Sequence, residues 1–391
     1  MSIAEVLEKI PVSGIRRLFE LASKMPEVIN LGIGEPDFDT PEHIKKAAVE
    51  ALEEGYTHYT SNAGLPELRE AIVRKLKKDN GIEASVEEII VTVGGEQALA
   101  NAIFTLVKPG DEVLIPSPAF VSYRPLIQMV GGVPVEVPVR EENDFCPVVE
   151  DLKNYVTGKT KAIIINTPCN PTGAVYPRKV LEEVADFAVE HDLTVISDEA
   201  YEKIVFEGGH VSIASLNGVK DRVVSVFTFS KTYAMTGWRL GYAVARKDII
   251  DRMVKLNMYL VACPVAFAQK AALAALEGPQ DCVERMVSEY RRRIDLVFRR
   301  LSEMLDVSVI KPKGTFYIFP NISRYGKSEK VAEQLLYSAK VAVVPGSAFG
   351  RYGEGYLRIS CATSYEKLAE AMDRIEEWME WMKTYGSRKT Q

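Results

Sequence analysis

The sequence SKTYAMTGWRLGY at residues 230–242 follows VVSVFTF at residues 223–229, an apolar run typical of a buried strand. Lys231, just past this run, is expected at the rim of a sheet and close to its apolar interior. Burial lowers the pKa of a lysine, and a lysine that is partly neutral can attack a carbonyl group and form a Schiff base. Eight residues later comes Arg239, a residue type suited to holding a phosphate. A lysine for an aldehyde and an arginine for a phosphate are what pyridoxal phosphate (PLP) requires.

The composition is that of an ordinary globular protein. Of the 391 residues, 47% are apolar and 26% are charged, and the net charge of −6 gives no indication of a nucleic-acid or anionic-membrane partner. The five cysteines form no CxxC pair and the four histidines lack metal-ligand spacing, which favours a reducing compartment and predicts no metal site. No secretory signal and no apolar run of membrane-spanning length is recognisable, so a cytoplasmic protein is expected.

Strand-like and helix-like segments alternate from residue 88 to residue 229. Continuous apolar runs such as AIII at residues 162–165 are typical of strands covered on both faces, and helical connections between strands predict a largely parallel sheet. Ligands bind beyond the carboxyl ends of the strands in such sheets. This rule selects four positions, each at or just past the end of a strand: Phe120, Asn170, Asp198 and Lys231. Farther along the chain, residues 307–310 and 315–320 are expected to be strands of a C-terminal part.

Three further features have both a structural and a functional interpretation. The turn at Gly94 and Gly95 joins a strand to a helix, where backbone N–H groups can bind an anion, although a plain turn is the simpler interpretation. Asp198 ends a buried strand and must find a partner, either by capping a helix or by facing a cationic group of a ligand. Arg358 lies mid-strand and is either a surface ion pair or a bidentate clamp for a carboxylate.

In their order along the chain, these motifs resemble those of the class I aminotransferases, PLP enzymes of fold type I, and most closely the archaeal aromatic and aspartate enzymes of the I-gamma branch. The segments that carry the resemblance are GEPDF at 34–38, NTPCNPTG at 166–173, DEAY at 198–201, SKTYAMTGWRLG at 230–241 and RIS at 358–360. The resemblance implies an α/β fold with a mainly parallel seven-stranded sheet between helices. It also implies a large PLP-binding domain over residues 42–278 and a smaller α/β domain formed by residues 1–41 and 279–391.

The resemblance further implies a role for individual residues. Lys231 would carry PLP and move protons, Asp198 would face the pyridine nitrogen, and Tyr201 would reach the phenolic oxygen. The implied cofactor-binding residues are Gly95 and Glu96 through backbone amides, Phe120, Asn170, Asp198, Tyr201, Thr228, Lys231, Arg239 and, from the other subunit of a homodimer, Tyr59. The implied substrate-binding residues are Gly34, Asn170, Phe120, Ile15 and, as the α-carboxylate clamp, Arg358. Cis peptide bonds are implied before Pro118 and Pro171.

The implied activity is a ping-pong transfer of an amino group from an amino acid to a 2-oxo acid such as 2-oxoglutarate. The N-terminal segment, which lies over the substrate pocket in the family, is apolar at Ile15 and Phe19 although Arg16 and Arg17 lie between them. Aromatic donors are therefore favoured, with glutamate as the shared partner. Aspartate or alanine aminotransferase is the alternative, and a PLP-dependent β-lyase would use the same residues. A dinucleotide-dependent dehydrogenase is disfavoured, because Asp37 stands where a GxGxxG loop has its third glycine.

Overall fold

The computed structural model describes residues 25–216 and 218–385. Its centre is a seven-stranded sheet with the strand order β2-β8-β7-β6-β5-β3-β4. The strands are β2 (Ile89–Thr92), β3 (Glu112–Ser117), β4 (Val133–Pro138), β5 (Thr160–Asn166), β6 (Thr194–Asp198), β7 (Val223–Thr228) and β8 (Gly241–Val244). β8 pairs antiparallel with β2 and β7, and the remaining pairs are parallel. The expected α/β fold with a mainly parallel seven-stranded sheet is confirmed.

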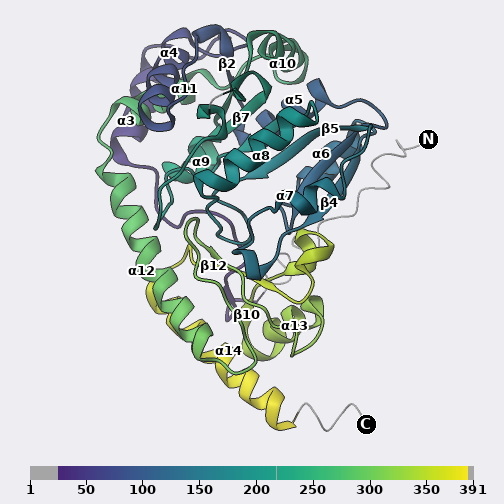
Figure 1. Cartoon of the computed structure of the whole chain (residues 1–391). Helices are drawn as coiled ribbons and strands as arrows, with labels where there is room; N and C mark the ends of the chain where they lie inside the picture. Colours follow the sequence, from purple (N-terminus) through teal and green to yellow (C-terminus); the bar gives the residue numbers. More distant parts are fainter. Residues whose placement is uncertain (1–24, 217, 386–391) are drawn as a thin grey trace, which may run out of the picture.

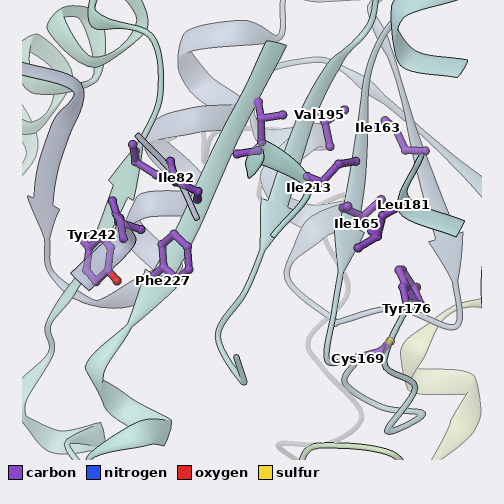
Figure 2. Packing of buried hydrophobic residues seen from close by; sticks show 14 of the residues in the cluster. Ile82, Ile163, Ile165, Cys169, Tyr176, Leu181, Val195, Ile213, Phe227 and Tyr242 are labelled. Atoms are coloured by element: carbon purple, nitrogen blue, oxygen red, sulfur yellow. The ribbon is translucent and has the colours of Figure 1, made fainter. Parts of the chain in front are cut away.

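Helices cover both faces of this sheet, as the continuous apolar strands predict. Ile163 and Ile165 of β5 join a core with residues of α3, α4, α8 and α11, whereas Ile164 between them joins a second core with α5, α6 and α10. Figure 2 shows the first of these cores around β5 and β6. The helices are α3 (Glu42–Glu53), α4 (Pro66–Lys75), α5 (Gly94–Leu106), α6 (Tyr123–Met129), α7 (Val149–Lys153), α8 (Arg178–Glu190), α10 (Lys247–Leu260) and α11 (Ala266–Glu277).

A second group of elements packs around its own apolar core. It contains β1 (Ile29–Asn30), β9 (Tyr317–Ile318), β10 (Val341–Ala342), β12 (Leu357–Ser360), α12 (Asp281–Glu303), α13 (Ser328–Gln334) and α14 (Tyr365–Tyr385). β11 (Val344–Pro345) pairs with β12, but its Val344 packs in the core of the large sheet. β1 pairs parallel with β10, so a segment from the N-terminal part joins the C-terminal elements. In Figure 1, α12 runs from the large sheet along one side of the molecule to this second group, where α14 lies beside it.

The C-terminal strands are shorter than the sequence suggests. Residues 307–310 contribute only an isolated bridge between Ser308 and Asn321, and the expected strand at 315–320 is reduced to β9. Thr315 has a positive φ of 64°, which is incompatible with extended strand backbone. In the described residues, no helix is both long and apolar enough to cross a membrane.

The sheet topology determines where a ligand site can form. β7, β6, β5 and β3 are consecutive neighbours and all run in the same direction, so their carboxyl ends lie along one edge of the sheet. Asp198 is the last residue of β6, and Lys231, Asn170 and Phe120 follow the ends of β7, β5 and β3 within four residues. The four positions selected from the sequence therefore belong to adjacent strand ends.

Candidate active site

A cavity of about 350 Å³ lies at this edge of the sheet. It is lined by eleven of the residues that the sequence singled out: Gly34, Gly95, Glu96, Phe120, Asn170, Asp198, Tyr201, Thr228, Lys231, Arg239 and Arg358. The same cavity is lined by residues that the sequence did not single out, among them Asn166, Ser230, Thr236 and Tyr317. Two candidates lie elsewhere: Tyr59 is 89% exposed on this chain, and Ile15 lies outside the described residues.

Lys231 sits in α9 (Phe229–Thr232), a single helical turn that follows β7 directly. The Thr228 hydroxyl accepts a hydrogen bond from the backbone N–H of Ser230 at 3.2 Å and so caps this turn. The Lys231 ammonium donates to the carbonyl oxygen of Gly34 at 2.6 Å. Burial lowers the pKa of Lys231 to about 8, and the nearby Glu35 only partly offsets this effect. A larger fraction of this amine is therefore neutral near pH 7 than for an ordinary lysine.

Asp198 is a buried carboxylate with two defined partners. Tyr123 donates its hydroxyl to Oδ2 at 2.6 Å, and the backbone N–H of Ala200 donates to Oδ1 at 3.2 Å. Burial nevertheless raises the pKa of Asp198 to about 6. Sequence reasoning missed Tyr123, although its position three residues after Phe120 was an available signal, and the two rings pack edge to face at 5.6 Å.

The glycine turn and Arg239 form an anion-binding cradle. Gly94 begins α5 with a φ of 82°, and a Cβ built on it would lie 2.6 Å from the guanidinium of Arg239. Arg239 itself has a left-handed backbone (φ 55°) and donates to the carbonyl oxygen of Thr236 at 2.9 Å. The start of a helix, a guanidinium and the Thr228 hydroxyl thus line one end of the cavity, an arrangement suited to a phosphate.

Arg358 also lines the cavity. This buried arginine donates to Oδ1 of Asn170 at 3.0 Å and to the carbonyl oxygen of Gly32 at 2.7 Å. Its Nε atom is buried and lacks a hydrogen-bond partner among the described residues. The guanidinium also stacks on the ring of Tyr317 at 4.3 Å, and the Tyr317 hydroxyl lies 3.0 Å from that of Tyr201. An arginine with an unused buried donor in a cavity is suited to binding a carboxylate.

Gly34 leaves room for the Tyr317 side chain, which contacts Arg358 and Tyr201. A Cβ on Gly34 would lie 2.3 Å from the Tyr317 hydroxyl oxygen, so any larger residue here would displace the tyrosine. The peptide bonds before Pro118 and Pro171 are cis, as expected, and the bond before Pro168 is cis as well.

These residues fit PLP on chemical grounds. The cofactor needs a cradle for its phosphate, an amine for its aldehyde and an acceptor for its ring nitrogen. The Gly94 turn with Arg239 could supply the first, Lys231 with its lowered pKa the second, and the buried Asp198 the third. None of these three functions needs Arg358, which could bind a second molecule, the substrate.

The comparison with known proteins agrees with this chemistry. The family model described as "Aminotransferase class I and II" matches residues 26–375. The aspartate aminotransferase of Pyrococcus abyssi is 57% identical, and the aromatic-amino-acid aminotransferase 2 of Thermococcus litoralis is 54% identical; each alignment covers 96% of this chain and 98% of the relative. The solved aromatic aminotransferase from Pyrococcus horikoshii OT3 is 56% identical with a TM-score of 0.90, over 95% of this chain and 100% of that one. The chain therefore belongs to the class I and II aminotransferase family and is a transaminase that uses pyridoxal phosphate.

Proposed function

We propose that the enzyme favours aromatic amino acids as donors, with glutamate and 2-oxoglutarate as the shared pair, in a ping-pong cycle. The observation that carries this preference is the charge of the cavity. Three cations line it among the residues described: Lys231, Arg239 and Arg358. Each of the three would already have a function: Lys231 in the reaction, Arg239 at the phosphate and Arg358 at the substrate α-carboxylate. A donor whose side chain bears a second carboxylate would find no further cation in this lining.

Other residues of the lining support the same preference. Glu96 places an acidic side chain on the cavity wall, which would repel a second carboxylate. Phe120, Leu99 and Tyr317 offer apolar and aromatic surface for a ring. Glutamate, as the shared partner, would need a cation from outside this lining. Arg16 and Arg17, which adjoin Ile15 in sequence, lie outside the described residues.

The cofactor would be held by residues of the large sheet. Gly95 and Glu96 through their amides, Thr228 and Arg239 would bind the phosphate, while Asn170 and Tyr201 would bind the phenolic oxygen. Phe120 would pack against the ring, and Asp198 would accept a hydrogen bond from the ring nitrogen. Bound PLP supplies an electron sink for the negative charge that arises when the Cα–H bond of the amino acid breaks.

Lys231 is the proposed acid and base of the reaction. Its Nζ would take the proton from the substrate Cα and later return a proton to the cofactor side. The pKa of about 8 suits this exchange, because both the neutral and the charged amine are accessible near neutral pH. Arg358 would hold the substrate α-carboxylate in bidentate fashion, for which its unpaired Nε and its stacking on Tyr317 support the assignment.

The homodimer is proposed on an exposed apolar surface. Residues near Tyr59 and residues 258–265 are joined by hydrogen bonds, such as that from Asn62 Nδ2 to the carbonyl oxygen of Ala262 at 2.6 Å. Both segments present large apolar side chains, including Tyr59, Tyr259 and Leu260. Pairing of two chains through this surface would bring Tyr59 of one subunit to the cofactor phosphate of the other. We also propose the division into a domain of residues 42–278 and a domain of residues 1–41 and 279–391, because most of the second apolar core comes from residues 279–391. The two cores share the boundary: Tyr201, Ile204 and Phe206 join the second core, and Phe319, Val344 and Phe349 join the first.

Visible absorption of the PLP-loaded enzyme during addition of single amino acids tests the donor class. Phenylalanine or tyrosine should abolish the cofactor band without any oxo acid, and 2-oxoglutarate should restore it. Aspartate is the second candidate, because the Pyrococcus abyssi relative is named an aspartate aminotransferase. A response to aspartate or alanine alone would overturn the aromatic preference, and pyruvate or ammonia released without an acceptor would indicate a β-lyase. Lys231→Ala should lose the band and the reaction while still binding PLP through the phosphate cradle.

A further inference from the structure

A second cavity, of about 840 Å³, lies outside the active site and exceeds it in volume. Its walls come from α4, α11 and residues 280–291 at the start of α12. Figure 1 shows α4 and α11 together at the end of the molecule where α12 begins. Tyr233, two residues after Lys231, also lines this cavity and donates to Gln280 Oε1 at 3.0 Å. The second cavity therefore adjoins the segment that carries the reactive lysine.

Five cations line this second cavity, and three of them have carboxylate partners. These three pairs are Arg74 with Glu277 at 2.5 Å, Lys203 with Asp79 at 2.7 Å, and Lys75 with Glu202. The other two, Lys78 and Arg291, form no ion pair with any residue of the described segments 25–216 and 218–385. Arg291 donates to the carbonyl oxygen of Phe206, which leaves most of its donors unused.

The unpaired charges leave the second cavity net positive. Two cations, Lys78 and Arg291, are opposed by one unpaired carboxylate, Glu284, from the same lining. Lys78 and Arg291 are exposed residues, and an excess of positive charge in a concave site attracts anions. A guanidinium with free N–H groups is suited to the planar geometry of a carboxylate.

The rest of the lining is apolar. Ala71 of α4, Leu276 of α11, and Val283 and Val287 of α12 contribute hydrocarbon surface. Ala71 and Val283 are buried, and Leu276 and Val287 pack against the apolar core of the large sheet. A ligand that satisfies both parts of the cavity carries an anionic group and an apolar group.

We propose that the second cavity is a binding site for a small organic carboxylate with an apolar substituent. The carboxylate binds Arg291 and Lys78, and the substituent packs between α4, α11 and α12. The ligand contacts three helices at once and reaches Tyr233, so it binds the folded chain at a place where the large sheet meets the long helix leading to the C-terminal elements. This site is independent of the donor preference proposed above.

Equilibrium dialysis of the PLP-loaded enzyme with radiolabelled phenylacetate tests the proposal. Because Arg358 can also bind a carboxylate, binding is measured in the Arg358→Gln protein as well as in the wild type. We expect one phenylacetate per chain to persist in Arg358→Gln. Arg291→Gln added to this background should raise its Kd at least tenfold, the effect of losing one charge-assisted hydrogen bond.

Two further variants distinguish a site from a general charge effect. Lys78→Gln changes an exposed side chain and should weaken binding severalfold without affecting folding. Arg285→Gln is the matched control, since Arg285 lies on the same helix, pairs with Asp281 and does not line the cavity. It should leave the Kd unchanged. Absence of binding in Arg358→Gln would overturn the proposal, and so would equal effects of Arg285→Gln and Arg291→Gln.

Discussion

Asp198 shows how burial raises the free energy of a single ionised carboxylate in the folded protein. Its carboxylate ends a buried strand, and burial raises its pKa from 3.8 to about 6 despite the hydrogen bond from Tyr123. A shift of this size corresponds to about 3 kcal/mol that the charged form costs the folded apoprotein. A cationic partner, such as a protonated ring nitrogen, would offset that cost. The buried charge therefore destabilises the folded apoprotein, and binding of the cofactor would offset this destabilisation.

The sign of this effect gives a prediction. Between about pH 4 and pH 6 the folded apoprotein retains a proton on Asp198 that the unfolded chain has lost, so its stability falls as the pH rises through this range and then levels off. Asp198→Asn removes the charge but keeps the size of the side chain. At pH 7.5 the apo variant should be more stable than the apo wild type by up to about 3 kcal/mol, and the gain should vanish near pH 4.

Urea unfolding of the two apoproteins, followed by circular dichroism at pH 4.5 and 7.5, measures this difference. The PLP-loaded variant should also transaminate far more slowly than the wild type. A variant that is no more stable than wild type at pH 7.5 would contradict the assigned cost of the buried carboxylate.

Residue patterns predicted the polar part of the site better than the aromatic part. Asp198, Asn170 and Lys231 could be recognised because each is a polar residue at or shortly after the end of an apolar strand. Burying a polar side chain there without a hydrogen-bond or charge partner is costly. Tyr123 and Tyr317 are buried tyrosines whose sequence context looks like ordinary core. Their hydroxyl partners come from elements 75 and 116 residues away, and local periodicity contains no information on such contacts.

At the scale of elements, strand β8 and the start of α5 are in unusually close contact. A Cβ on Gly241 would lie 2.6 Å from the backbone nitrogen of Gly95 and 2.7 Å from the carbonyl oxygen of Phe227. Backbone atoms cannot move aside as side chains do, so only glycine fits here. The contact fixes the glycine turn of the phosphate cradle against the sheet.

Gly241→Ala should therefore weaken both the fold and the cradle. Forcing β8 away from the turn is expected to cost about 2–4 kcal/mol, to lower the thermal midpoint by several degrees, and to weaken PLP binding at least tenfold. Thermal unfolding of the apoprotein and spectrophotometric PLP titration measure the two effects. Gly237→Ala is the matched control, because a Cβ there meets nothing within 4 Å. Similar behaviour of the two variants would contradict this account.

The elements that the sequence predicted well are those with a long, uniform pattern. The inner strands of the large sheet, such as β5 and β7, have continuous apolar runs because both of their faces are covered, and these runs can be recognised in the sequence without knowledge of the fold. The C-terminal strands were predicted less well. β9 keeps only two residues because Thr315 turns the chain with a positive φ and Pro312 and Pro320 flank the region, so tertiary pairing rather than local propensity decides its length.

At the scale of the whole molecule, the proposed homodimer rests on an exposed apolar surface. Tyr59, Tyr259 and Leu260 are 89%, 76% and 52% exposed, an unusual concentration of large apolar side chains for a surface that stays in water. The hydrogen bond from Asn257 Nδ2 to the carbonyl oxygen of Asn62 at 2.9 Å ties α10 to the loop that carries Tyr59. The surface is thus a preformed unit rather than a set of separate loops.

Leu260→Asp should break the proposed homodimer, because a carboxylate buried in an apolar interface without a partner costs several kcal/mol. We expect the dimer Kd to rise at least a hundredfold in sedimentation equilibrium, and PLP affinity to fall with it, since each site would lose the Tyr59 of the other subunit. Leu305→Asp is the control: Leu305 is equally exposed, at 54%, but follows the far end of α12. If both variants stay dimeric, the interface lies elsewhere. If Leu260→Asp becomes monomeric but binds PLP as tightly as the wild type, Tyr59 does not complete the site across the dimer.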